Sequence, residues 1–418
     1  MTGMTTPTQP ARSELSKTFA LELDVLRGIA AVLMIFNHAG FWLLDPSELS
    51  GTPAAITVFL GGFAPVVFFF ATGFGIALSR PNGRLPEIAS LLWKAALLVV
   101  ADQFFFWTRG FAWGLDFFSF IAIASVVVTV VARFRRAAMV CVALIVLLIG
   151  LRYGLGPGIR SNVHQFAFFD WVVGANAVER VSYPLSPWMV YPLLGFLLGC
   201  LYKSVNLQSP NPRNLWFRHG SIVALGLFAM ALLLALFNNS FFRWGSVSFA
   251  FFVLSLGIVL ASGLLSMYLT ISHRRFAEAL ALRGVASFAV IPLHYAMLAA
   301  GAASLGLPVG QLGFAALAVL IIVVSFRASF WFAAAMASAS VASHRQGLLP
   351  TLLLLLAVLA LVTLLEASRA LVPVALLLLL GQLVVAAILG MRPGKPAPVD
   401  GVPLVTRQPA ALASRTLD

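Results

Sequence analysis

Arg27 and His38 are the residues of the first apolar segment that could do chemistry. The segment runs from Leu23 to Leu44, LDVLRGIAAVLMIFNHAGFWLL, and is long enough to cross a bilayer as a helix. A spacing of eleven residues is almost three whole helical turns, so both side chains project from one face, about 16 Å apart. A charge inside a membrane is costly unless it faces a wet cavity or a partner. We therefore predict that this helix lines an intramembrane reaction channel shared by Arg27 and His38.

His38 is the first candidate for catalysis, as a general base. A neutral imidazole can take a proton from a hydroxyl or amine near pH 7 and return it to a leaving group. The alternative is a hydrogen-bonded packing histidine. We favour the functional interpretation because Asn37, a candidate substrate-binding residue, lies beside His38 and Arg27 lies on the same face. Arg27 is either a clamp for an anionic ligand or an ion-pair partner of Asp24, and both roles can hold together.

Two aspartates are candidates for the acid that orients His38. Asp102 lies deep in the third apolar segment, beside Gln103, and Asp116 lies at the outer end of the fourth. A carboxylate at membrane depth either pairs with a cation or belongs to a site. We predict His38, Asp102 and Asp116 as the catalytic residues, and the sequence leaves open which aspartate faces the imidazole.

Further candidates for substrate binding come from three other segments. Arg80 and Arg84, in the loop SRPNGR, either collect a phosphate-rich donor or serve as ordinary charge anchors. Trp188 belongs either to an aromatic belt at the membrane interface or to a carbohydrate-stacking surface. His294 follows Pro292 within an apolar segment. It either lines a polar, kinked part of a cavity or hydrogen bonds the carbonyl that the proline frees.

The composition identifies the fold class. Of 418 residues, 61% are hydrophobic and 10% are charged, whereas a soluble domain carries about 25% charged residues. The chain is therefore expected to be a polytopic bundle of transmembrane helices, all-α, with about ten core helices and two C-terminal ones. The formal net charge of +13 is attributed to Lys and Arg in cytoplasmic loops, not to nucleic-acid binding. No motif for nucleotide hydrolysis, zinc binding or a serine hydrolase is present, and we expect no metal.

Hydropathy and turn residues give the expected helices and domains. The helices are 23–44, 54–78, 88–107, 112–132, 137–155, 187–202, 219–237, 246–271, 285–304, 309–333, 349–366 and 370–390. Basic residues follow the even-numbered helices, which places both termini in the cytoplasm. We expect disordered tails over 1–19 and 392–418, a catalytic domain over 20–335, and a C-terminal helix pair over 348–391 as a structural appendix.

The residues around Arg27 and His38 resemble a known family. The Arg27-x10-His38 spacing, LDVLRGIAAVLMIFNHAG and FFFATGFGIAL are similar to the integral membrane acyltransferase 3 family. GVASFAVIPLHYAML, with His294, is similar to a late helix of that family. SYPLSPWMVYPLLGFLLG, which contains Trp188, resembles the related heparan-alpha-glucosaminide N-acetyltransferases. The loop after the second helix departs from the family's RxxR, because here Arg80 and Arg84 are four residues apart.

The resemblance implies transfer of an acyl group, usually acetyl, from cytoplasmic acyl-CoA to an acceptor beyond the membrane. The acceptor would be a hydroxyl or amine of a cell-surface glycan or glycolipid, and the protein would lie in a bacterial-type inner membrane. His38 would act as base or would carry the acyl group itself. The rival hypothesis is a transporter or flippase in which Arg27, His38, Asp102 and His294 form a path for protons or substrate.

Overall fold

The computed structural model describes residues 12–79, 85–107, 114–155, 171–173, 181–208, 211–237, 247–304, 308–342 and 371–390. These ranges form helices and no strand, apart from two isolated bridges, Leu44 with Val309 and Leu115 with Val181. The predicted all-α class is therefore confirmed. Arg80, Arg84, the predicted helix over 349–366 and the C-terminal tail lie outside the described residues.

The helices largely follow the predicted segments. They are α1 Arg12–Leu43, η1 Pro46–Leu49, α2 Pro53–Gly61, α3 Ala64–Ser79, α4 Leu85–Trp107, α5 Phe117–Val131, α6 Ala137–Ile149, η2 Gly150–Leu155, α9 Leu185–Trp188, α10 Val190–Gln208, α11 Pro212–Phe237, α12 Phe249–Ser272, α13 Arg274–Leu280, α14 Ala286–Ser304, α15 Gln311–Ala342 and α17 Leu371–Gly390. Two differences bear on the predicted domains. Residues 12–19, expected as a tail, form the first turns of α1, and α15 continues about two turns beyond its predicted end. Both extensions are free of Gly and Pro, which allows a helix to continue.

Six helical segments among the described residues are long and apolar enough to cross a membrane. They are Pro53–Ser79, Ala137–Gly154, Leu185–Asn206, Pro212–Phe237, Phe249–Ser272 and Gln311–Met336. The segments at α6 and α11 bury little of their surface in the protein, as expected for helices whose apolar sides face lipid. By length and composition, these segments confirm the predicted bundle of membrane helices.

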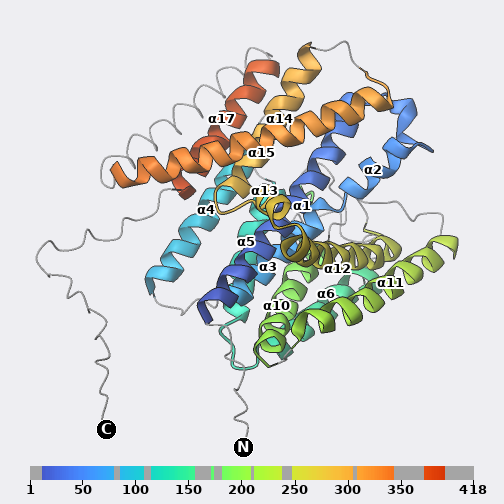
Figure 1. Cartoon of the computed structure of the whole chain (residues 1–418), viewed down its shortest axis with the longest axis vertical. Coiled ribbons are helices and arrows are strands. Elements are labelled where there is room, and N and C mark those ends of the chain that lie inside the picture. The colour runs from blue at the N-terminus through green and yellow to red at the C-terminus, as the bar shows by residue number, and fades with distance from the viewer. Residues whose placement is uncertain are drawn as a thin grey trace, which may run out of the picture.

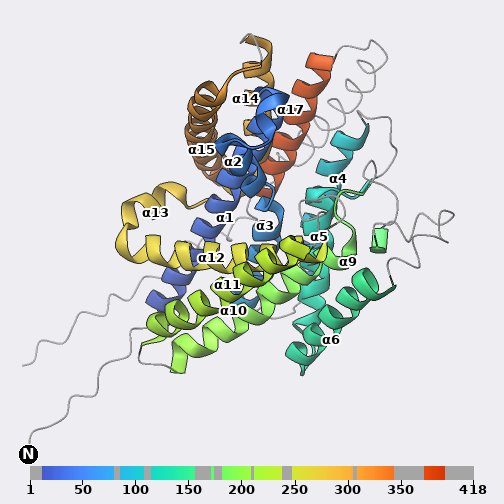
Figure 2. The same ribbon diagram turned by 90° about the vertical axis from the view of Figure 1, so that its right-hand side faces the viewer.

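Helix α1 falls outside these six segments but lies in the middle of the bundle. It contacts α2, α3, α12, α13, α14 and α15. Figures 1 and 2 show it passing between α14 and α15 on one side and α10 to α12 on the other. A residue on α1 can therefore meet side chains from segments hundreds of residues away.

The second predicted helix is broken into α2 and α3 by a turn at Gly62 and Phe63. Before the break, α2 packs on α1 near Asn37, while beyond it α3 packs against both α1 and α10. The contact of α3 with α10 is very close. A Cβ atom at Gly73 would meet the carbonyl oxygen of Pro192, and one at Gly195 would meet the carbonyl oxygen of Phe70. Small residues permit this approach of two backbones.

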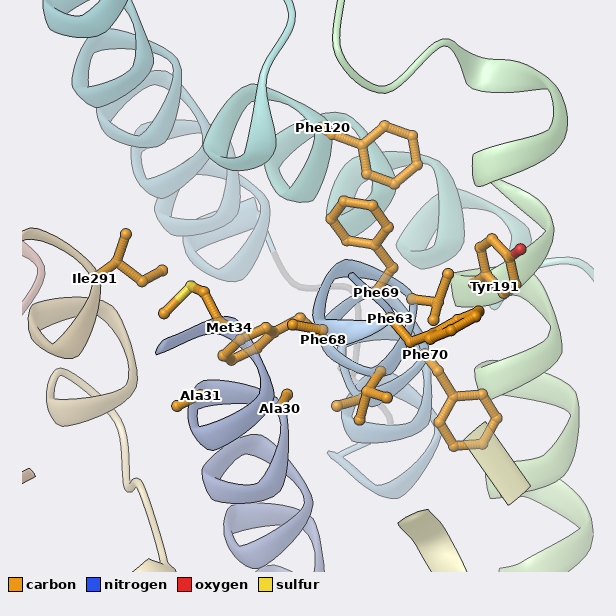
Figure 3. Close-up of a cluster of buried hydrophobic side chains, with 14 of the residues drawn as sticks. Ala30, Ala31, Met34, Phe63, Phe68, Phe69, Phe70, Phe120, Tyr191 and Ile291 are labelled. Carbon is orange, nitrogen blue, oxygen red and sulfur yellow. The ribbon is translucent and has the colours of Figure 1, made fainter. Parts of the chain in front are cut away.

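The core is dominated by aromatic and aliphatic side chains around α1, α3, α5 and α10. Figure 3 shows Phe69 beside Phe120, with ring centroids 4.2 Å apart, and Met34 and Ala31 on α1 close to Phe68 and Ile291. This apolar core fixes the relative positions of the helices that carry polar residues.

The last described helix, α17, is part of the bundle and not an appendix. It packs against α4, α14 and α15 (Figure 2). Its residues Val385 and Ala386 are fully buried. Its polar residue Gln382 donates to the carbonyl oxygen of Ala101 at 3.3 Å. The Leu-rich sequence of this helix suits burial between helices as well as it suits lipid, so hydropathy could not separate the two.

Candidate active site

A cavity of about 680 Å³ lies beside the C-terminal half of α1. Its walls are mostly apolar, with a few polar side chains from four helices, α1, α4, α14 and α17, and from the segments that precede α5 and α9. The polar residues that line it are Asn37, His38, Asp102, Asp116, Tyr183, Tyr295 and Gln382. An apolar pocket with a few converging polar groups is the usual form of a small-molecule site.

His38 is joined to α14 by two hydrogen bonds. Its Nδ1 atom lies 2.8 Å from Nε2 of His294, and its Nε2 atom lies 3.2 Å from the hydroxyl of Tyr295. The other ring nitrogen of His294, Nδ1, lies 3.0 Å from the carbonyl oxygen of Val290. His294 is fully buried, whereas His38 and Tyr295 line the cavity.

This chain of hydrogen bonds determines which nitrogen of His38 carries the proton. The carbonyl of Val290 can only accept, so Nδ1 of His294 is the donor and, in the neutral ring, Nε2 is the acceptor. His38 therefore donates from Nδ1 to His294. The Nε2 atom of neutral His38 is then unprotonated and accepts from Tyr295. The lone pair that could take a proton from a substrate is thus on the nitrogen beside the cavity.

Asn37 holds the wall of the cavity next to His38. Its Nδ2 atom donates to the carbonyl oxygen of Val58 at 2.9 Å, which ties α1 to α2. The side chain also lines the cavity. The structure therefore places the predicted pair, Asn37 and His38, at one site.

The carboxylate of Asp102 accepts hydrogen bonds from backbone amides at the start of α5. The donors are the N–H groups of Asp116 at 3.1 Å, Phe118 at 3.2 Å and Ser119 at 2.7 Å. A carboxylate is favourable at a helix N-terminus, where the first amides lack intrahelical partners. The group next to Nδ1 of His38 is His294, so neither Asp102 nor Asp116 occupies the orienting position that the sequence analysis assigned to an aspartate. Both aspartates nevertheless line the cavity.

Arg27 lies apart from the cavity. Its Nη1 atom donates to Oδ1 of Asp24 at 2.8 Å, and Arg283 approaches the other oxygen of Asp24 at 3.8 Å. Arg27 is not among the residues that line the cavity. Between Arg27 and His38 on the same face of α1 lie Ala31, which is fully buried, and Met34, which is 6% exposed. An apolar layer therefore separates the two residues, and the predicted shared channel is not open in this structure.

The remaining candidates are placed as follows. Trp188 is 1% exposed and packs against Phe69, Tyr183 and Tyr191 in the core. Its ring therefore presents no free face for a sugar, because neighbouring aromatic rings cover it. His294, predicted to bind substrate, lies behind His38 and does not line the cavity.

Sequence reasoning did not select Tyr183, Tyr295 and Gln382 as site residues. Tyr295 follows His294 directly, and Gln382 is a polar residue in a Leu-rich helix, so each carried a weak signal. Tyr183 lies in a segment whose aromatic residues suit an interfacial belt. Only the tertiary structure brings Tyr295 of α14, Gln382 of α17 and Tyr183 of the segment before α9 to one cavity with His38.

Comparison with known proteins supports one of the two resemblances. The family model described as heparan-alpha-glucosaminide N-acetyltransferase, catalytic, matches residues 20–216, just under half of the chain. The match includes Asn37, His38, Asp102 and Asp116, whereas His294, Tyr295 and Gln382 lie beyond it. No curated protein and no solved structure matches the chain. The resemblance to acyltransferase 3 stays a prediction.

Proposed function

We propose that this chain is a membrane-embedded acyltransferase. It moves an acyl group, expected to be acetyl, from acyl-CoA to a hydroxyl or amine of a surface glycan or glycolipid. The observation that supports this most is the Nε2 atom of His38, unprotonated at the cavity and held there by His294. The family match over residues 20–216 supports the same class of reaction.

The proposed reaction uses His38 as general base. Nε2 of His38 takes the proton from the acceptor hydroxyl or amine, whose oxygen or nitrogen attacks the thioester carbonyl carbon. The carbon–sulfur bond breaks, CoA leaves as a thiolate, and the imidazolium returns the proton to the sulfur. In the alternative, Nε2 attacks the thioester carbonyl carbon, the carbon–sulfur bond breaks and CoA leaves as a thiolate. The acyl group then passes from Nε2 to the oxygen or nitrogen of the acceptor, whose proton goes to the thiolate. Both routes need the same nitrogen unprotonated.

Tyr295 has a role in either route. Its hydroxyl donates to Nε2 of His38 in the present structure, at 3.2 Å. When an acceptor occupies that nitrogen, the hydroxyl is released to donate elsewhere in the cavity. We propose that it then donates to the thioester oxygen, where negative charge develops.

The donor would enter from the Arg27 end of α1, which is cytoplasmic in the predicted orientation. Acyl-CoA has a polyanionic head, which suits Arg27 and Arg283, and a long thin arm. The arm can reach His38 only if the layer formed by Ala31 and Met34 opens. Met34 is suited to this because an unbranched thioether changes conformation easily.

The test is acyl transfer by the purified full-length chain in lipid vesicles. Radiolabelled acetyl-CoA is supplied on one side, and free CoA and labelled acceptor glycolipid are measured. His38→Ala should abolish transfer, and His219→Ala, which changes an exposed histidine on α11, should not. Full transfer by His38→Ala would refute the proposal. Movement of unmodified solute without CoA release would favour a transporter instead.

A further inference from the structure

A second hollow lies at the other end of α5 from the active-site cavity. It has a volume of about 770 Å³ and is enclosed by the α5–α6 connection, the first turn of α6 and α10. None of its lining residues is shared with the His38 cavity. The fifteen residues of α5 separate the two by about 22 Å.

The entrance to this hollow is strongly basic. Arg133, Arg135 and Arg136 line it, all three are exposed, and no acidic residue lines it. None of the ion pairs found among the described residues involves these arginines. The N-cap of α6 is Arg136, which gives no side-chain hydrogen bond to the first amides of the helix. The dipole of α6 therefore adds to a positive potential that suits an anion.

Apolar side chains also line this hollow. Phe134, Met139, Phe196, Leu197 and Leu201 line it. Beyond the hollow, the exposed face of α6 continues the apolar surface with Val142 and Val146, which are 51% and 64% exposed. A ligand that matches both parts has an anionic head and a hydrocarbon chain.

We propose that this hollow binds one anionic phospholipid of the surrounding membrane. The headgroup phosphate lies among Arg133, Arg135 and Arg136, and an acyl chain follows the groove between α6 and α10. Basic hollows at the membrane surface between helices bind anionic lipid headgroups in this way. Acyl-CoA fits less well, because the hollow shares no lining residue with the His38 cavity and lies at the other end of α5. The site is independent of the proposed acyl transfer.

The test compares lipid binding by the full-length chain and its variants. Delipidated protein in detergent is titrated with phosphatidylglycerol or phosphatidylcholine, and bound lipid is counted by native mass spectrometry. The wild type should bind one phosphatidylglycerol in preference to phosphatidylcholine. The variant Arg133→Gln/Arg135→Gln/Arg136→Gln should lose affinity about a hundredfold, because each of the three arginines near an anionic headgroup contributes about a fivefold factor.

Two further variants distinguish a defined site from diffuse attraction. Arg218→Gln/Arg274→Gln/Arg275→Gln removes the same charge from exposed positions outside the hollow and should bind as the wild type does. Ser204→Trp fills the hollow without changing the charge and should weaken binding, with elution as a single folded species as the check on folding. Equal losses in the two triple variants, or unchanged binding by Ser204→Trp, would overturn the proposal. Displacement of the lipid by free CoA would also overturn it.

Discussion

His38 and His294 are 256 positions apart in the sequence, yet Nδ1 of the first lies 2.8 Å from Nε2 of the second. The contact joins α1 to α14 and is anchored by the carbonyl of Val290. Its consequence is chemical, because a ring that donates from Nδ1 keeps Nε2 available as a base. We therefore treat His294 as a positioning residue for His38.

Replacing His294 should lower the rate of transfer more than it weakens substrate binding. His294→Leu removes the acceptor for Nδ1 of His38, so the tautomer with a free Nε2 is no longer favoured. A general base contributes a factor of about 10²–10⁴ to the rate. We expect kcat to fall by less than this factor and KM to change little. Steady-state kinetics in vesicles measures this split.

His294→Gln is the matched control for that substitution. The Oε1 atom of glutamine can accept from His38 while its amide donates to Val290, so activity should be partly restored. If Leu and Gln variants were equally impaired at equal folded content, the orienting role of His294 would be refuted.

Enlarging the apolar layer between Arg27 and His38 should block the donor. Ala31→Leu adds bulk at a fully buried position between the two residues. We expect a raised KM for acyl-CoA and an unchanged KM for the acceptor, because the proposed route of the acceptor does not pass Ala31. Met230→Trp, at a half-exposed position of α11, serves as the control. An unchanged KM for acyl-CoA in a folded Ala31→Leu variant would exclude this entry path.

Asp102→Ala should reduce stability, because Asp102 accepts three amides at the start of α5. Leaving buried amides without an acceptor costs about 1–3 kcal/mol in the free energy of unfolding. Thermal unfolding in detergent, followed by intrinsic fluorescence, measures the loss.

Asp116→Ala is the comparison for Asp102→Ala, since Asp116 makes no side-chain cap to α5. Its effect on stability should be smaller. A stability loss in Asp116→Ala as large as that in Asp102→Ala would contradict the capping role.

Gly73→Ala should destabilise the pair of helices α3 and α10. The added Cβ atom would meet the carbonyl oxygen of Pro192, so the two helices must separate. Gly226→Ala on α11 meets nothing within 4 Å and should be neutral or slightly stabilising, by up to about 1 kcal/mol. The melting temperatures of the two variants are compared. Equal melting temperatures would show that the close approach of α3 and α10 does not contribute to stability.

The sequence by itself determined the helical membrane class and most of the helix bounds, and it predicted a site at the Asn37–His38 pair. These follow from local properties, namely hydropathy over about twenty residues and the rarity of polar groups at membrane depth. It also marked His294 as unusual, although the suggested contact with substrate differs from its buried place behind His38.

Tertiary structure decided the partners of these residues. A hydropathy pattern does not encode which face of α14 meets α1 or which face of α17 meets α4, because lipid-facing and helix-facing positions are equally apolar. For that reason the sequence suggested Asp102 or Asp116 next to His38 and did not identify His294 there, and it could not show that Ala31 and Met34 lie between Arg27 and His38. Packing between distant helices placed His294 next to His38 and placed Ala31 and Met34 between His38 and Arg27. The contact with His294 also determines that Nε2 of His38 is the unprotonated nitrogen.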